Sequence, residues 1–197
     1  MLTELKKKMY SVKTFGCEVL GKKAEKITVF DDKLAELAAD MVEIMNYFDG
    51  IGLAAPQIGI SKRLVVLGIP DNPEQTNKSI GEVMLLDKMP LVLVNPEIIS
   101  FGSDLCDYDE GCLSVPGIYG NVRRPYTVTL KAQDLQGNFF EYECGGLLAR
   151  CIQHELDHLD GFLFVDRMDE EDRKNIDFKL FRLKKNGKKK EYNRPWK

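Results

Sequence analysis

The sequence predicts an α+β fold, with antiparallel or mixed β-sheets packed around a central helix and an additional helix nearer the N-terminus. Two stretches show the three- and four-residue apolar spacing of amphipathic helices. Short β-rich runs lie around them, separated by Gly, Pro, Asn and Asp. Because these runs do not alternate regularly with helices, a parallel α/β architecture is not expected.

The composition is typical of one soluble domain with a real core. The chain has 197 residues, 44% of them hydrophobic, with 28 basic side chains against 31 acidic ones, which excludes a disordered or fibrous protein. The charge-free run at 50–61 is shorter than the roughly 18 apolar residues of a membrane helix, so no membrane partner is expected. The five cysteines are scattered and odd in number, and the N-terminal stretch lacks the apolar segment of a signal peptide. We therefore expect a cytoplasmic protein.

The first helix is expected to begin at Asp31–Asp32 and to end near Asp49–Gly50. Either aspartate can cap the N-terminus, because a short polar side chain accepts a hydrogen bond from the free backbone N–H groups. The apolar stripe, which we interpret as core, comprises Leu34, Leu37, Ala38, Met41, Ile44, Met45 and Phe48.

The segment after the first helix is expected to contain a loop and two short strands. The loop covers Gly50–Gly59, and the first strand covers 63–67, before Gly and Pro. The polar stretch at 71–82 is interpreted as a surface excursion. A second strand at 91–94 is expected to stop at Asn95–Pro96.

A hairpin and the central helix follow. The stretches 126–132 and 139–143 are expected to pair as strands across a turn at 134–138, which contains a glycine. The central helix is expected to begin at Gly145–Gly146 and to end at Asp160–Gly161, where glycine can close the last turn.

The two histidines of the chain lie in the central helix, in the run His154-Glu155-Leu156-Asp157-His158. Residues four apart share one helix face, so both imidazoles can reach one ion. The carboxylate of Glu155 is placed to take a proton from water activated by that ion. The spacing therefore predicts a metal-binding helix, the alternative being ordinary core or surface histidines.

A catalytic metal site usually takes three protein ligands, and the chain has no third histidine. Cys112 lies in a run rich in Gly and Pro at 110–117, where the backbone can approach a site closely. It is the candidate third ligand, although a small buried residue in a turn is the alternative interpretation. The other four cysteines are interpreted as buried or incidental thiols: Cys17, Cys106, Cys144 and Cys151.

Three motifs in this sequence together resemble the peptide deformylase family. They are Gly-Ile-Gly-Leu-Ala-Ala-Pro-Gln at 50–57, Glu-Gly-Cys-Leu-Ser at 110–114 and Gln-His-Glu-Leu-Asp-His-Leu at 153–159. Each is moderately specific alone, whereas the combination, in this order and separation, is very specific. The resemblance extends from roughly Val12 to Asp166.

The resemblance implies hydrolysis of the N-formyl group from the initiator methionine of nascent polypeptides, with release of formate. It implies one divalent metal ion per chain, typically Fe²⁺, with Zn²⁺, Ni²⁺ or Co²⁺ as alternatives. Carried over position by position, the metal ligands would be Cys112, His154 and His158. Glu155 would be the general base and acid, while the Gln57 side chain and the Leu113 backbone N–H would bind the developing oxyanion.

The expected substrate is a formyl-Met peptide that adds as a strand to the protein. It would pair along Ile51–Gly52 and near Gly111, with the methionine side chain in an apolar pocket. Leu147 and Cys151 are expected to form one wall of that pocket.

The C-terminal end is strongly basic. Residues 182–197 carry eight basic side chains and one acidic one, which gives this segment a net charge of +7. Because the whole chain has a net charge of −3, residues 1–181 have a net charge of −10. We expect a catalytic domain over 1–181 and a basic tail over 182–197. Two interpretations of the tail fit equally well: contact with ribosomal RNA phosphates, or a solvated terminus. DNA is not an expected partner.

Two other functions share these residues. A zinc peptidase uses the same His-Glu-x-x-His core, but a convincing downstream carboxylate ligand is missing here and Cys112 is present. A non-catalytic binding module would saturate the ion with a fourth protein ligand. Loss of turnover in Glu155→Ala with metal still bound would separate an enzyme from such a module.

Overall fold

The computed structural model describes residues 10–70 and 78–187, with the side chains of 186 and 187 excepted. Its helices are η1 (Glu18–Gly21), α1 (Asp32–Tyr47), η2 (Ala55–Ile58), α2 (Ile80–Leu86), α3 (Gly146–Asp160), η3 (Phe164–Asp166) and α4 (Glu170–Gly187), where η marks a 3₁₀ helix. Its strands are β1 (Gly52–Ala54), β2 (Leu64–Leu67), β3 (Leu91–Phe101), β4 (Leu105–Gly111), β5 (Tyr119–Pro125), β6 (Thr127–Gln133) and β7 (Phe139–Gly145).

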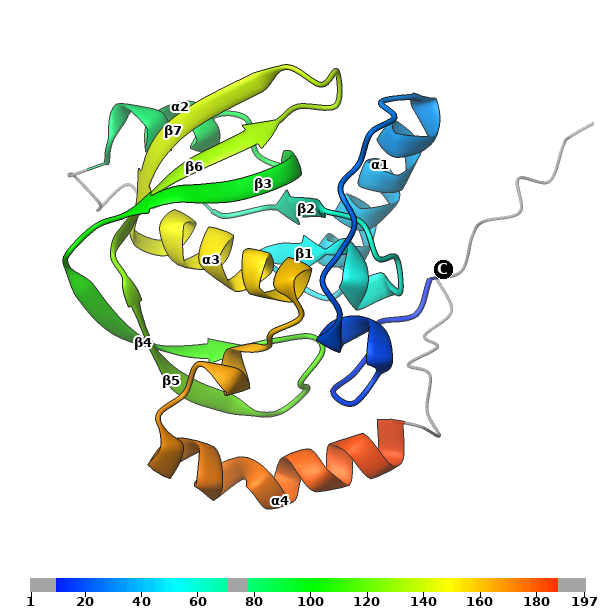
Figure 1. Ribbon diagram of the computed structural model, residues 1–197, viewed down its shortest axis with the longest axis vertical. Coiled ribbons are helices and arrows are strands. Elements are labelled where there is room, and N and C mark those ends of the chain that lie inside the picture. Colours follow the sequence, from blue (N-terminus) through cyan, green and yellow to red (C-terminus); the bar gives the residue numbers. More distant parts are fainter. Residues whose placement is uncertain (1–9, 71–77, 188–197) are drawn as a thin grey trace, which may run out of the picture.

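The strands form two sheets with α3 between them (Figure 1). The larger sheet has the order β1-β2-β3-β6-β7, and the smaller is the ribbon β4-β5. Neighbouring strands in both sheets run antiparallel. The predicted α+β class, with sheets packed around a central helix, is therefore confirmed.

The large sheet is covered on both faces near α3, which explains why β2 is buried along its whole length. Val65 and Leu67 face the core that contains Leu148 and Ile152 of α3. The alternate β2 residues, Leu64 and Val66, face a second core that contains Met41, Met45 and other residues of α1. Alternation of side chains across a strand thus joins α1 and α3 to opposite faces of one sheet.

Both predicted long helices are confirmed, including their ends. The Asp31 side chain accepts a hydrogen bond from the Leu34 N–H at 3.0 Å, as an N-cap residue does. Helix α3 ends at Gly161, whose φ of 84° closes the helix in the left-handed conformation that glycine adopts without strain. The hairpin of β6 and β7 is also confirmed.

The prediction that the strand at 91–94 stops at Asn95–Pro96 is wrong. Strand β3 continues to Phe101, and its register with β6 shifts between Val94 and Glu97. Asn95 has a φ of 50°, and its side chain bonds the backbone N–H and C=O of Ile27 at 2.8 Å each. A β-bulge therefore accommodates Pro96 within the strand, at the position where we predicted that the strand ends.

Several elements were missed or misjudged. The expected loop at Gly50–Gly59 contains β1 and η2, and the expected excursion at 71–82 runs into α2. Residues 71–77 lie outside the described residues. The β4-β5 ribbon and α4 were not predicted.

The predicted boundary between residues 181 and 182 falls inside a helix, because α4 continues to Gly187. Ile176 and Leu180 of α4 pack against β5 and η3, in a third core that contains Val122 and Phe164. Residues 188–197 of the predicted tail lie outside the described residues. Within the described parts of the chain, no helix has both the length and the apolar character of a membrane span.

Candidate active site

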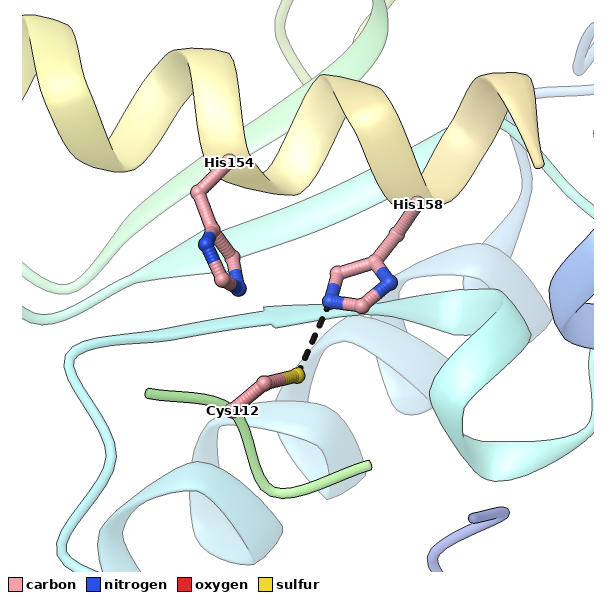
Figure 2. A group of neighbouring side chains, drawn as sticks. All are labelled: Cys112, His154 and His158. Carbon is pink, nitrogen blue, oxygen red and sulfur yellow. Dashed lines mark hydrogen bonds between the residues drawn. The ribbon is translucent and has the colours of Figure 1, made fainter. Parts of the chain in front are cut away.

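Helix α3 and the loop after β4 bring three metal-ligating side chains together (Figure 2). His154 and His158 project from the same face of α3 towards Cys112, which directly follows the last residue of β4. The Cys112 Sγ and His158 Nε2 atoms are 3.2 Å apart, and one ligand atom from each of the three residues lies within 4.8 Å of the others. The predicted meeting of one sulfur with two distant imidazoles is therefore confirmed.

The donor set suits a divalent transition metal. Bonds of about 2.0–2.3 Å to nitrogen and sulfur place neighbouring ligands of a tetrahedral ion about 3.3–3.6 Å apart, close to the spacing observed here. Within residues 10–70 and 78–187, no further Cys, His, Asp or Glu joins the group. Three protein ligands leave a position for water or substrate, as catalytic sites do and structural sites do not.

The buried carboxylate of Glu110 fixes the orientation of His154. The Glu110 Oε2 atom is 2.8 Å from His154 Nδ1 and also accepts from Arg124. Burial raises the pKa of Glu110, but the hydrogen bonds of His154 and Arg124 outweigh it and lower that pKa to about 2. An ionised carboxylate can only accept, so Nδ1 carries a proton and Nε2 is the nitrogen that can bind a metal.

The two imidazoles differ in their protonation when no metal is bound. Burial and the nearby charge of His154 lower the pKa of His158 well below its ordinary value, so His158 is neutral. Burial also opposes the charged form of His154, but hydrogen bonds to Cys112 and Glu110 raise its pKa well above normal. Metal binding at His154 therefore requires release of a proton.

Gln57 reaches the metal group from η2, beside β1. Its Oε1 accepts the Ala54 N–H at 2.7 Å, which fixes the amide so that Nε2 faces the cluster. Nε2 is 3.4 Å from both Cys112 Sγ and Ser114 Oγ. The buried amide thus presents N–H groups at the site.

The loop after β4 presents a second donor. The Ser114 N–H points at the Cys112 sulfur at 3.4 Å, and the Val115 N–H donates to the Cys112 carbonyl at 2.9 Å. The intervening Leu113 lines the cavity, and its N–H has no hydrogen-bond partner within the described residues. A free N–H beside the cluster is available to a substrate oxygen.

Glu155 is buried against the backbone of β1, and glycine makes this approach possible. A Cβ at Gly52 would lie 2.4 Å from Glu155 Oε1, far inside contact distance. Glu155 Oε2 is buried and has no hydrogen-bond partner within the described residues. Burial raises the pKa of Glu155 to about 7, which places proton uptake and release near neutrality.

A cavity of about 510 Å³ opens in front of the cluster. It is lined by all five residues predicted to bind substrate: Ile51, Gly52, Gly111, Leu147 and Cys151. Gln57, Leu113, Cys112, His154 and Glu155 also face it, whereas His158 is fully buried behind the lining. All predicted site residues except His158 therefore line one cavity.

Sequence reasoning missed several residues that support the cluster. Glu110 was seen only as part of a motif, although its position two residues before Cys112 was a usable signal. Arg124 and Arg150 both bind Glu110 inside the protein, at 2.6 and 2.8 Å. No spacing pattern reveals such pairs, because their partners lie far apart in the chain.

The fold and site define a metallohydrolase: a cysteine and two histidines leave one position open to solvent, beside a buried carboxylate, the amide of Gln57 and the N–H of Leu113. Residues 9–174 match the model of the polypeptide deformylase family. A peptide deformylase from Prochlorococcus marinus (strain AS9601) is 47% identical over 157 residues, covering 80% of this chain and 72% of that protein.

Solved deformylase structures are similar to this chain over nearly its whole length. The Plasmodium falciparum enzyme has a TM-score of 0.78 at 33% identity, covering 92% of this chain and 99% of that one. Peptide deformylase 1B from Arabidopsis thaliana, in complex with an inhibitor, has a TM-score of 0.78 at 36% identity, covering 93% and 97%. The chain belongs to the peptide deformylase family, hydrolases that remove the N-formyl group from nascent polypeptides.

Proposed function

We propose that Cys112, His154 and His158 hold one divalent metal ion, that Fe²⁺ is the metal used in the cell, and that Zn²⁺, Ni²⁺ or Co²⁺ can replace it. Support comes from the convergence of three ligand atoms within 4.8 Å and from a donor set that accommodates several divalent metals. The family resemblance favours Fe²⁺. When bound, the ion supplies Lewis acidity, which lowers the pKa of water so that a nucleophile is available near neutral pH.

Glu155 is the proposed general base and acid. It accepts a proton from the attacking water and delivers it to the amine that leaves when the formyl C–N bond breaks. Its burial, its unpartnered Oε2 and its raised pKa of about 7 support this role. A carboxylate with an ordinary pKa would be a weaker base and would take the proton from water less readily.

Gln57 and the Leu113 N–H are the proposed oxyanion donors. Negative charge develops on the formyl oxygen during attack, and fixed donors stabilise it more than mobile water does. The hydrogen bond from the Ala54 N–H holds the Gln57 amide in place before the reaction. Loss of one such donor typically costs about 3 kcal/mol of transition-state stabilisation.

The peptide is proposed to bind as an added strand at the free edge of β1. Strand order places β1 at the edge of the five-stranded sheet, so one side of its backbone is unpaired there. Ile51 and Gly52 offer backbone groups on one side of the cavity and Gly111 on the other. Leu147 and Cys151 form the apolar wall against which the methionine side chain packs.

Residues 182–197 are proposed to contact ribosomal RNA phosphates, with the enzyme working in the cytoplasm. Arg182, Lys184 and Lys185 are exposed on the last turns of α4, where a polyanion can reach them. Removal of the residues after Phe181 should weaken ribosome binding in a salt-dependent way and leave turnover of small peptides unchanged. Unchanged ribosome affinity would show that the tail is merely solvated.

The observation that carries the proposal is the meeting of the Cys112 sulfur with both imidazoles beside the buried Glu155. Anaerobically purified protein should contain about one iron per chain and should deformylate a formyl-Met peptide. The matched controls are the unformylated peptide and a peptide offering only internal amides. Cleavage of internal amides without deformylation would overturn the assignment.

A further inference from the structure

A line of alternating charges runs from the surface to His154. Arg167 donates to Asp157 Oδ1 at 2.6 Å, and Arg124 donates to Asp157 Oδ2 at 2.8 Å. Arg124 also donates hydrogen bonds to both carboxylate oxygens of Glu110, at 2.6 and 3.0 Å. Glu110 Oε2 accepts from His154 Nδ1 at 2.8 Å. Each link is within hydrogen-bond distance, so the five groups form one continuous relay.

We propose that Arg167 is a positioning residue for the metal site, acting through Asp157, Arg124 and Glu110 to hold the imidazole of His154 in its metal-binding orientation. The inference rests on the proposed role of His154 as a metal ligand. Arg167 itself does not line the active-site cavity.

Because the inner residues of the relay are buried, loss of the exposed residue Arg167 should affect all of them. The side chains of Asp157, Arg124 and Glu110 are only 11%, 7% and 5% exposed, so water cannot replace a lost partner freely. Arg167 is 44% exposed and lines a separate cavity, together with Arg124 and Asp157. It is therefore the member of the relay that can be altered without opening a hole in the core.

The geometry of Arg167 is fixed on both sides. Its guanidinium lies 4.7 Å from the ring centroid of Phe162, which follows the C-cap of α3. It also reaches Asp157 with two nitrogens, Nε and Nη2. A planar fork held in this way orients a carboxylate, which a lysine ammonium does not.

Removal of Arg167 would leave Asp157 with Arg124 as its remaining hydrogen-bonded cation. Arg124 is shared between two carboxylates, so a stronger pull from Asp157 weakens its bidentate hold on Glu110. Arg150 also binds Glu110, at 2.8 Å, and limits the disturbance. We therefore expect a moderate loss of metal-site order rather than collapse of the site.

The test uses Co²⁺-loaded full-length enzyme and four variants. Arg167→Ala should release Co²⁺ to a chelator about tenfold faster, at the lower end of effects seen for residues behind metal ligands. Its visible Co²⁺ absorption should change, and kcat should fall with KM within about twofold of the parent value. Arg167→Lys keeps the positive charge but lacks the planar guanidinium, so it should give intermediate values. It also keeps the proposal testable if the alanine variant does not fold.

Arg123→Ala is the matched control. Arg123 precedes Arg124 in β5 and makes a similar two-nitrogen pair with Asp107, but on the surface and outside the relay. It should match the parent enzyme in Co²⁺ release, spectrum and kcat. If both Arg167 variants also match the parent, the inference is wrong.

His154→Ala separates this inference from the proposed function. If His154→Ala loses Co²⁺ while both Arg167 variants behave as the parent, the relay fails and the ligand assignment stands. If His154→Ala holds Co²⁺ as tightly as the parent, the ligand assignment fails and the relay has no metal ligand to position.

Discussion

The two faces of α3 differ in their roles: one packs in the apolar core and the other carries polar groups at the cavity. The face towards the large sheet presents Leu148, Ile152 and Leu159, which are buried among apolar residues of the strands. The cavity face presents His154 and His158 towards Cys112 (Figure 2), and it is bordered by Glu155, which lies against β1 and also lines the cavity. Apolar burial on one face stabilises the helix, and that stability allows costly polar groups to be held on the other.

The two faces also differ in how well their polar groups are satisfied. Glu155 Oε2 and His158 Nδ1 are buried without hydrogen-bond partners within the described residues. A buried polar atom without a partner costs about 1–3 kcal/mol, so such atoms persist mainly where function uses them. The comparison therefore predicts that substitutions on the cavity face change chemistry, while those on the sheet face change stability.

The largest effect is expected for Glu155→Gln. The amide keeps the shape of the side chain but cannot take up the proton, so kcat should fall by about 10²–10⁴. Metal content, measured on the same sample, should stay at the parent level because Glu155 is outside the ligand group. Near-normal turnover with metal bound would break the assignment of chemistry to this face.

A substitution on the sheet face should cost a comparable free energy, but the cost should appear in the stability of the fold and not in the rate. Ile152 is fully buried, and Ile152→Ala should lower the free energy of unfolding by about 2–5 kcal/mol. Denaturant titration measures the loss, and kcat should be close to the parent value well below the midpoint of unfolding. A large fall in kcat of the folded variant would show that the two faces are not independent.

The next effect tests a group that reaches the site from outside α3. Gln57→Ala removes one proposed oxyanion donor and should lower kcat by about 10²–10³. Stability and metal content should change little, since Gln57 hydrogen-bonds the sulfur through a long 3.4 Å contact. If KM rises while kcat is unchanged, Gln57 contributes to ground-state binding instead.

The smallest of these effects is expected for Gly52→Ala. The new Cβ would overlap Glu155 Oε1 and force the carboxylate aside, and a displacement of about 1 Å can cost about 10²-fold in rate. Gly21→Ala is the control, because a Cβ there meets nothing within 4 Å. Equal activity of the two variants would show that the position of Glu155 is not critical.

The parts of the fold that were predictable are those with a strong period and clear ends. Helices α1 and α3 bury one face, so their apolar spacing and their capping residues are visible in the sequence. Strand β4 is mostly exposed, and neither strand of the β4-β5 ribbon has a regular apolar alternation in its sequence. Asn95–Pro96 looked like a strand end because local sequence does not show that the Asn95 side chain bonds Ile27.

The active site, like the fold, has parts that the sequence predicts and parts that it does not. The helical spacing of His154 and His158 and the family motifs indicated the cluster and the residues around the cavity. The relay behind it could not be inferred, because Arg124, Asp157 and Arg167 meet only after the chain has folded. Tertiary contacts between distant charged residues leave no periodic pattern.

X-ray absorption at the metal edge of the anaerobically purified enzyme tests the central claim most directly. The account predicts one sulfur scatterer at about 2.3 Å and two imidazole nitrogens near 2.0–2.1 Å, with a light scatterer from solvent, and loss of the sulfur in Cys112→Ser. A metal without sulfur, or one saturated by four protein ligands, would contradict it.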